Sequence, residues 1–343
     1  MSARGQGVVR SAQVSFLLLY AAASIFRGTP LLDVATYGEA LTVLCAADPG
    51  PLAQVEHFTK RAAGAELNVA IGLARLGLRV GLLTRVGSDS FGRFLLDTLA
   101  AEGIGTAAVT VDAQHRTGFY LKARRTDGGD PDIEYFRAGS AASFLSPADY
   151  RAEVFEHARH VHLTGIGPAI SESSYALAQH IAARAAAAGT SSSFDPNLRP
   201  QLWRSRELMI ERINALATQA QWVLPGLEEG RVLTGRTAPA DIAAFYLERG
   251  VRGVVVKLGA DGAYLRTTQI EAQIPAAPVD EVLDTVGAGD GFAVGFISAL
   301  LEGHEPQRAA ARGNLIAGLA IRVIGDCEGL PTRAALEAAE RGL

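Results

Sequence analysis

The segment that says most about this chain is Asp284-Thr285-Val286-Gly287-Ala288-Gly289-Asp290, followed by the apolar run Gly291-Phe292-Ala293. Three small residues at 287–289 allow backbone N–H groups to converge where a helix begins. Such unpaired amides, together with the helix dipole, favour an anion. Asp290 would then lie beside the anion, where its carboxylate can accept the proton of a hydroxyl group. In the simpler interpretation, Asp290 only complements the dipole of an ordinary helix start.

Away from this segment, apolar runs with strand character alternate with alanine-rich helical runs. This alternation predicts an α/β fold with a mostly parallel sheet and helices on both faces. The expected strands are 32–37, 79–85, 160–163, 191–195, 222–224 and 253–257. The expected helices are 67–76, 90–102, 171–188, 206–220, 239–249, 288–301, 307–323 and 333–340. In open sheets of this kind, ligands bind beyond the carboxyl ends of the strands.

Two stretches, about 41–63 and 117–137, break the alternation. Residues 117–124 and 133–137 have strand character, and turn-forming residues separate them in the sequence Thr126-Asp127-Gly128-Gly129-Asp130-Pro131. Such a pair is more easily explained as an antiparallel flap than as part of a parallel core. We therefore expect a small β-sheet lid beside the main sheet.

Composition limits the possible partners. The chain has 343 residues, a formal net charge of -4 and no run rich in lysine or arginine. Nucleic acid is therefore not expected as a partner, because neutralising phosphates needs clustered positive charge. Only two cysteines occur, Cys45 and Cys327, without metal-ligand spacing. This argues against a disulfide framework and favours a reducing cytoplasm.

The string at 284–292 closely resembles the second signature of the ribokinase-like (PfkB-type) carbohydrate kinases. The resemblance implies that Asp290 is the catalytic base, that Gly287, Ala288 and Gly289 form the anion hole, and that Asp284 lies near Mg²⁺. A Walker-type GxxxxGK[ST] motif is missing from the sequence, which excludes P-loop kinases. The expected activity is phosphoryl transfer from ATP to a sugar hydroxyl.

A second match lies near the N-terminal end of the resemblance, which covers about residues 31–343. Residues 63–70 are similar to the family's glycine-rich signature, which implies that sugar hydroxyls are bound by Gly64, Ala65, Glu66, Leu67 and Asn68. Many members have a second glycine where this chain has Ala63. Taken without the family match, the segment predicts only an N-capped helix that follows a turn.

Within the family, residues 117–122, 135–143 and 194–203 are most similar to kinases of 2-keto-3-deoxygluconate. This similarity implies that the sugar is contacted by Tyr120, Tyr135, Arg137, Arg199 and Asp326. The chemistry agrees independently, because a sugar acid carries a carboxylate that is costly to bury unless a guanidinium pairs with it. Alternatively, Arg137 is a solvated lid residue and Arg199 forms an ion pair at a strand end.

The strand and glycine turn at 254–263 resemble the family's nucleotide site. The resemblance implies ATP contacts from Lys257, Gly259 and Gly262, with Asn197 nearby and Asn314, a looser match, close to the adenine. Glu229 would help Asp284 to position Mg²⁺. Many relatives have asparagine where this chain has Gly226, so the metal here would be held without that amide.

Residues 1–30 match nothing in the family. Arg4 and Arg10 precede an apolar stretch, 14–26, that superficially reads as a signal peptide but is too short to span a bilayer. An enzyme that consumes ATP would have no nucleotide outside the cell. We expect an atypical extension that precedes one ribokinase-like domain, 31–343; export and a docked helix are the alternatives.

Several alternatives stay open. The acceptor could instead be 5-dehydro-2-deoxygluconate, fructose or 2-keto-3-deoxygalactonate, since a single hydrogen bond can separate such substrates. The chain could also be a non-catalytic sugar-binding regulator, although a positioned aspartate base argues for an enzyme. We expect a homo-oligomer formed through the lid and no membrane partner. His160 and His162 share one face of a predicted strand, which indicates a structural role.

Overall fold

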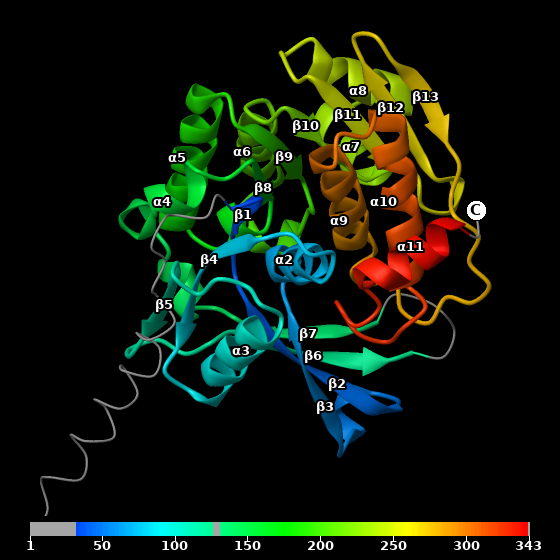
Figure 1. Ribbon diagram of the computed structural model, residues 1–343. Coiled ribbons are helices and arrows are strands. Elements are labelled where there is room, and N and C mark those ends of the chain that lie inside the picture. The colour runs from blue at the N-terminus through cyan, green and yellow to red at the C-terminus, as the bar shows by residue number, and fades with distance from the viewer. Residues whose placement is uncertain (1–31, 126–130, 342–343) are drawn as a thin grey trace, which may run out of the picture. The chain divides into compact units, whose positions relative to one another are not determined.

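The computed structural model describes residues 32–125 and 131–341 (Figure 1). The proposed extension, residues 1–30, lies outside the described residues. Among these described residues, none of the helices has both the length and the apolar character needed to cross a bilayer.

A nine-stranded sheet forms the centre of the fold, with the strand order β13-β12-β11-β10-β9-β8-β1-β4-β5. The strands from β11 to β5 in that order run parallel, whereas β12 and β13 are antiparallel to their neighbours. Their bounds are Val34–Tyr37 (β1), Val80–Gly87 (β4), Val109–Asp112 (β5), His160–Thr164 (β8), Ser191–Asp195 (β9), Trp222–Val223 (β10), Gly253–Lys257 (β11), Ala263–Thr267 (β12) and Glu271–Ile274 (β13). The predicted mostly parallel sheet is confirmed, and all six expected strands occur.

Helices cover both faces of this sheet, as Figure 1 shows. One face carries α2 (Ala65–Arg75), α3 (Ser90–Ala101), α9 (Ala288–Leu301), α10 (Pro306–Ala320) and α11 (Arg333–Arg341). The other carries α4 (Ala152–Phe155), α5 (Glu172–Ala188), α6 (Arg206–Ala217), α7 (Leu227–Thr234) and α8 (Pro239–Leu247). The strand pleat explains the division, because successive side chains point to opposite faces. On β11, for example, Val255 packs into one core and Val254 and Val256 into the other.

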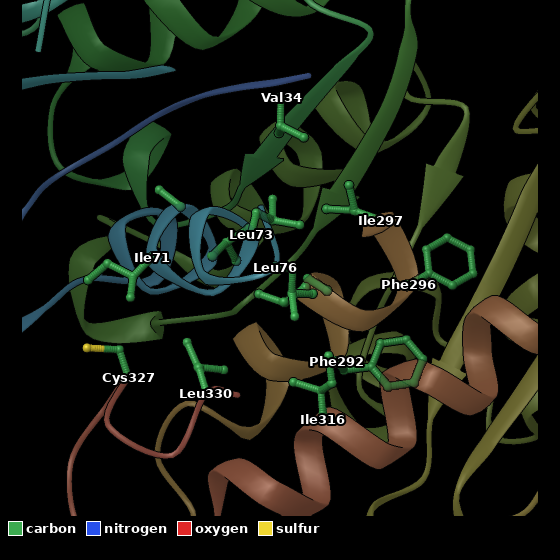
Figure 2. Packing of buried hydrophobic residues seen from close by; sticks show 14 of the residues in the cluster. Val34, Ile71, Leu73, Leu76, Phe292, Phe296, Ile297, Ile316, Cys327 and Leu330 are labelled. Atoms are coloured by element: carbon green, nitrogen blue, oxygen red, sulfur yellow. The ribbon is translucent and has the colours of Figure 1, made fainter. Parts of the chain in front are cut away.

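The core on the α9 side is formed where three helices meet the sheet. Figure 2 shows Ile71, Leu73 and Leu76 from α2 and its end beside Phe292 and Phe296 of α9. The helices α9 and α10 approach very closely at Gly295, where an added Cβ would lie 2.4 Å from the carbonyl oxygen of Arg312. Only glycine fits this crossing without moving backbone.

The two histidines of β8 are buried inside the sheet, as expected for a structural role. His160 and His162 are fully buried and both contact the Ser193 hydroxyl of β9 at 2.8 Å. Burial lowers the pKa of each to about 3, so both rings are neutral at physiological pH.

The lid is a separate four-stranded sheet with the order β3-β2-β6-β7. Its strands are β2 (Leu41–Pro49), β3 (Phe58–Ala63), β6 (Phe119–Arg124) and β7 (Ile133–Phe136). β2 and β6 pair in parallel, and each has an antiparallel partner on its other side. The expected lid is confirmed, and both irregular stretches of the sequence contribute to it.

Candidate active site

A cavity of about 610 Å³ lies where the carboxyl ends of the central strands meet the lid. Its walls combine residues that are far apart in the sequence, from the lid, from the turn after β9, from the end of β11 and from the start of α9. They are Glu39, Leu41, Gly64, Ala65, Asn68, Tyr120, Pro131, Ile133, Tyr135, Arg137, Ile166, Asp195, Asn197, Arg199, Gln201, Glu229, Lys257, Thr285, Val286, Gly287, Gly289, Asp290 and Asp326. Most of the residues singled out in the sequence are therefore brought together.

The glycine-rich turn at 287–289 leads directly into α9. Gly287 is the N-cap, with φ +83°, and a Cβ there would lie 2.2 Å from the carbonyl oxygen of Asp326. An L side chain is excluded at this position by both the backbone conformation and the close approach. Gly287 and Gly289 line the cavity, so the open amides of the first turn of α9 face it. This arrangement can bind an anion.

Asp290 occupies the first turn of α9 and is only 7% exposed. The Asn68 amide donates to its Oδ2 at 2.7 Å, and the Asn197 amide approaches its Oδ1 at 3.4 Å. Burial raises the pKa of Asp290 to about 7, against the opposing hydrogen bond from Asn68. A carboxyl group that titrates near neutrality beside an anion site is suited to general base catalysis.

The turn after β9 carries Asn197 and Arg199 into the cavity. Asn197 has φ +38°, and it is the only non-glycine residue with positive φ in the described chain. Such a conformation is uncommon and often marks functional sites. Among the described residues, no carboxylate forms an ion pair with Arg199, whose Nη1 donates to the carbonyl oxygen of Leu198 at 2.8 Å.

Lys257 and Glu229 approach the same turn from the neighbouring elements. Lys257, at the end of β11, pairs with Asp195 at the end of β9 at 2.6 Å. Glu229 lies near the start of α7, where its carboxylate accepts hydrogen bonds from the amides of Leu198 and Gly226, both at 2.7 Å. The helix α7 was not expected from the sequence, and its N-terminal turn explains how Glu229 reaches the cavity.

The lid contributes the opposite wall. The Tyr120 hydroxyl donates to Oδ2 of Asp326, and the rings of Tyr120 and Tyr135 pack 5.2 Å apart. Burial raises the pKa of Asp326, although Lys122 and Tyr120 oppose this effect. Arg137 also lines the cavity, but it is not solvated: its Nε donates to Oε2 of Glu39 at 2.7 Å.

Seven residues named from the sequence do not line the cavity: Glu66, Leu67, Asp284, Gly259, Gly262, Ala288 and Asn314. Leu67 belongs to the hydrophobic core, and Glu66 is buried beside it with Thr164 as a hydrogen-bond donor. Because successive helix residues point in different directions, Ala65 and Asn68 face the cavity while the two residues between them face inward. Ala288 lies between two lining glycines and is also absent from the wall.

The remaining four support the walls from behind. Asp284 accepts hydrogen bonds from the amides of Val286 and Gly325. Gly259 and Gly262 form the turn between β11 and β12 with φ +60° and +84°. The Asn314 amide donates to the carbonyl oxygens of Ile274 and Pro275.

Sequence reasoning missed two charged residues that line the cavity, Glu39 and Asp195, and one that lies behind its wall, Lys122. Asp195 is the last residue of β9, a strand expected from the sequence, so its place at a carboxyl strand end was a usable signal. Glu39 and Lys122 had no such signal, because their partners Arg137, Asp284 and Asp326 lie far away in the sequence.

Residues 31–333 match the family described as pfkB family carbohydrate kinase. The chain belongs to this family. It is therefore a carbohydrate kinase. Among curated proteins, the chain is 45% identical over 303 residues to a 2-dehydro-3-deoxygluconokinase of Bacillus subtilis, covering 88% of this chain and 93% of that protein.

Solved structures of family members agree with the fold. A PfkB protein from Polaromonas sp. JS666 shares 52% identity with a TM-score of 0.83, over 90% of this chain and 99% of that one. A ribokinase II from E. coli, in complex with ATP and Mg²⁺, shares 26% identity with a TM-score of 0.84, over 91% of this chain and 100% of that one.

Proposed function

We propose that this kinase phosphorylates 2-keto-3-deoxygluconate, also called 2-dehydro-3-deoxygluconate, at its 6-hydroxyl group. The observation that carries the proposal is the pair of arginines, Arg137 and Arg199, in the cavity that holds Asp290. A neutral sugar has little need of two guanidinium groups, whereas a sugar acid brings a carboxylate that requires a cationic partner when it leaves water.

Arg199 is the stronger candidate partner for that carboxylate. Arg137 is already paired with the buried Glu39, so the charge that it offers to a ligand is partly neutralised. Arg199 has only a backbone carbonyl as its hydrogen-bond partner among the described residues. Its fork of donors suits either the sugar carboxylate or the transferring phosphate. Arg137, Tyr120, Tyr135 and Asp326 would then hold the sugar from the lid side.

In the proposed mechanism, deprotonated Asp290 accepts the proton of the acceptor hydroxyl while that hydroxyl oxygen attacks the γ-phosphorus of ATP. The bond between the γ-phosphorus and the β–γ bridging oxygen breaks, and ADP leaves. Asn68 donates to one carboxylate oxygen of Asp290, which leaves the other directed toward Asn197 and the cavity. The amides of 287–289 stabilise the charge that spreads over the phosphoryl oxygens. Gly64 and Ala65, which line the wall beside Asn68, would contact the sugar hydroxyls.

The cavity has the oxygen donors that Mg²⁺ requires. Mg²⁺ is usually held by one or two carboxylates together with water and substrate phosphates. Within the described residues, no cluster of three metal-ligating side chains occurs, but Asp195 and Glu229 both present carboxylates to the cavity. We propose that Glu229 helps to hold Mg²⁺ and that Asp284, which lies behind the cavity wall, supports this site. Bound Mg²⁺ would neutralise charge on the nucleotide phosphates.

The nucleotide would lie along the turn after β11. Lys257 lines the cavity there, and Gly259 and Gly262 allow the backbone to turn sharply beside it. Asn314 would act near the adenine by holding the backbone at residues 274 and 275. We assign residues 31–343 to one kinase domain, with 1–30 as an extension.

A screen of acceptors tests the function. Initial rates with ATP and Mg²⁺ are measured on 2-keto-3-deoxygluconate, 2-keto-3-deoxygalactonate, 5-dehydro-2-deoxygluconate and fructose, and phosphorus NMR locates the new phosphate ester. We expect the highest kcat/KM on 2-keto-3-deoxygluconate and a 6-phosphate product. A preference for fructose would overturn the sugar-acid assignment.

We also propose that the protein is a cytoplasmic homo-oligomer. Cys45 and Cys327 are both buried free thiols, as a reducing compartment permits. The lid supports self-association because β7 is an edge strand whose Phe136 is 49% exposed. An exposed aromatic on an edge strand favours pairing with another chain.

A further inference from the structure

A lysine of the lid reaches into the phosphate-binding part of the core. Lys122 lies on β6, the strand between β2 and β7, and its side chain is only 3% exposed. Its Nζ is 2.6 Å from Oδ2 of Asp284 and 2.9 Å from Oδ1 of Asp326. One ammonium group therefore joins the lid to two acids of the core.

Both acids support backbone that forms the anion site. Asp284 accepts hydrogen bonds from the amides of Val286, which precedes the glycine turn, and Gly325, each at 3.1 Å. The carbonyl oxygen of Asp326 lies against Gly287, close enough that a Cβ on Gly287 would collide with it. Lys122 thus contacts an acid from each of the two segments that meet at the start of α9.

Without the ammonium group, this arrangement would be unfavourable. Two buried carboxylates near each other repel, and each is costly to keep charged away from water. Tyr120 supplies a hydrogen bond to Asp326 but no charge. The nearby Cys45 thiol, whose pKa is raised by burial to about 11, is neutral and cannot take part in the charge balance.

We propose that Lys122 is a positioning residue for phosphoryl transfer. Its ammonium group couples the lid to the anion-binding turn at 287–289 and orients Asp326 toward the sugar. The inference rests on the proposed transfer at Asp290. It assigns no contact with substrate to Lys122 itself, since Lys122 does not line the cavity.

The test compares Lys122→Met with Lys122→Arg, and uses Lys60→Met, an exposed lid lysine, as the matched control. Lys122→Met keeps the length of the side chain and removes the charge. We expect kcat to fall about 10- to 100-fold, the usual effect of losing a partner that orients a functional group. KM for ATP should change less than threefold, and Lys122→Arg should regain at least a tenth of the wild-type kcat.

The double variant Lys122→Met/Asp284→Asn separates positioning from folding. If the ammonium acts through Asp284, the double variant should lose much less than the product of the two single losses. A lysine with only a structural role would lower the melting temperature and leave kcat per folded molecule within twofold of Lys60→Met, which would overturn the proposal. If Lys122→Met does not fold, Lys122→Gln decides: kcat per folded molecule within twofold of Lys60→Met overturns the proposal.

The wild-type acceptor screen keeps the two hypotheses apart. A wild-type enzyme that prefers another sugar removes the substrate assignment, and the Lys122 comparison is then repeated on that sugar. A wild-type enzyme active on 2-keto-3-deoxygluconate with unaffected Lys122→Met removes only the positioning role.

Discussion

Asp290 combines deep burial, hydrogen bonds from two asparagines and a position in the first turn of α9. These three features have two origins. Burial and helix position follow from the local sequence, so a motif could identify this residue. The partners Asn68 and Asn197 come from distant segments, and only the folded sheet brings them together. The same is true of Glu39 and Lys122, whose sequence neighbours contain no sign of their partners.

The pH dependence of catalysis should report Asp290. Its pKa is raised to about 7, mainly by burial, and only the deprotonated form can accept a proton. We therefore expect kcat/KM to rise with pH through about 7 and then level off. Asp290→Asn should lower kcat by about 10²–10⁴-fold with little change in ATP affinity. Steady-state rates from pH 5.5 to 9 check both; turnover within threefold of wild type would remove Asp290 as the base.

Although Asp290→Asn should lower kcat, the same substitution should raise the stability of the folded protein at alkaline pH. Because the pKa of Asp290 is higher in the folded state than in the unfolded chain, folding favours the proton, and stability is lost as pH rises through about 7. Asp290→Asn removes that loss. Its melting temperature relative to wild type should therefore be higher at pH 8 than at pH 5. An equal difference at both pH values would mean that Asp290 does not titrate near 7.

Arg199 should select for an acidic acceptor. Replacing it with Met removes the cavity arginine that has no acid partner among the described residues, and the loss in kcat/KM on the sugar acid should be roughly 2–4 kcal/mol. Fructose, which has no carboxylate, should be affected much less. Arg137→Ala should show the same preference, with an added loss of stability because Glu39 stays buried without its partner. Arg204→Met, an exposed neighbour, serves as control; equal losses on both sugars would contradict the assignment.

At the scale of elements, the sequence predicted most of the fold because strands such as β11 are apolar runs that alternate with alanine-rich helices. The elements that it missed have weak patterns. In α7, only Gly230 and Leu233 are buried, so little helical periodicity is visible. β5 is an edge strand with Val111 exposed, and it offers no apolar run. The missed α7 matters most, since it positions Glu229.

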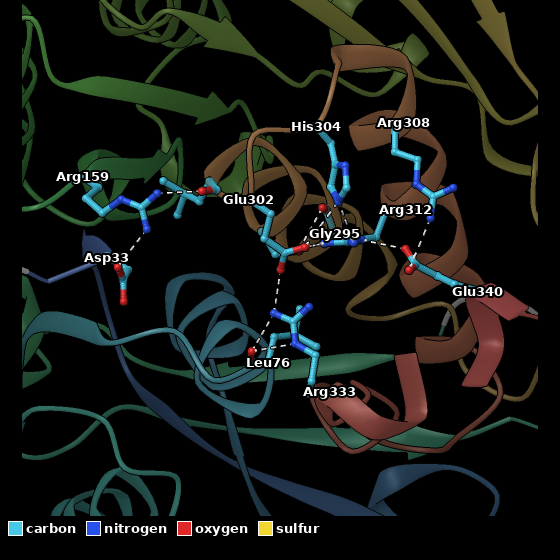
Figure 3. Close-up of polar contacts among 12 residues, drawn as sticks. Asp33, Leu76, Arg159, Gly295, Glu302, His304, Arg308, Arg312, Arg333 and Glu340 are labelled. Atoms are coloured by element: carbon cyan, nitrogen blue, oxygen red, sulfur yellow. Dashed lines mark hydrogen bonds and ion pairs between the residues drawn. The ribbon is translucent and has the colours of Figure 1, made fainter. Parts of the chain in front are cut away.

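The end of α9 is held by an ionic cluster that should contribute to stability. Figure 3 shows Glu302 between Arg312 of α10 and Arg333 of α11, with contacts of 2.6 Å to each. Arg312 is only 4% exposed. We expect Glu302→Gln to lower the free energy of unfolding by roughly 1.5–3 kcal/mol, the scale of a hydrogen bond to a charged group. Urea denaturation of this variant and of Glu337→Gln, an exposed glutamate of α11, measures the difference.

The effect of Glu302→Gln should depend on pH. Burial alone would raise the pKa of Glu302, but hydrogen bonds from Arg312 and Arg333 outweigh burial and hold the pKa below its ordinary value. The stabilisation is therefore present above the unfolded-state pKa and is lost as pH falls through the folded-state value. The two proteins should become similar in stability under strongly acidic conditions; a difference that stays constant with pH would exclude this ion pair as its cause.

At the scale of the whole molecule, the resemblance identified the family and its two-sheet design, but it could not give the chemistry of the contacts between the sheets. The lid also has an outer surface whose exposed aromatic is unusual for an isolated edge strand. Phe136 stacks on Phe119 with ring centroids 4.8 Å apart. This aromatic pair forms a rigid apolar surface that a second subunit could cover.

Phe136→Asp should therefore weaken the oligomer. The charge would oppose burial of the lid in an interface, so sedimentation velocity should show a shift to smaller species at micromolar concentration. Val323→Asp changes a comparably exposed apolar residue outside the lid and should leave the distribution unchanged. If wild type sediments as a monomer, or if both variants behave alike, the lid interface is wrong.

The lid is assembled from two segments that are far apart in the sequence. β2 and β3 precede α2, whereas β6 and β7 follow β5, and the parallel β2–β6 pairing unites them. Acceptor preference in this family therefore cannot be transplanted as one contiguous cassette. A chimera that imports residues 117–137 from a relative would pair the native β2 with an imported β6. The imported counterpart of Lys122 would then meet the native acids at 284 and 326. Engineering a new specificity requires exchanging both segments and these acids together.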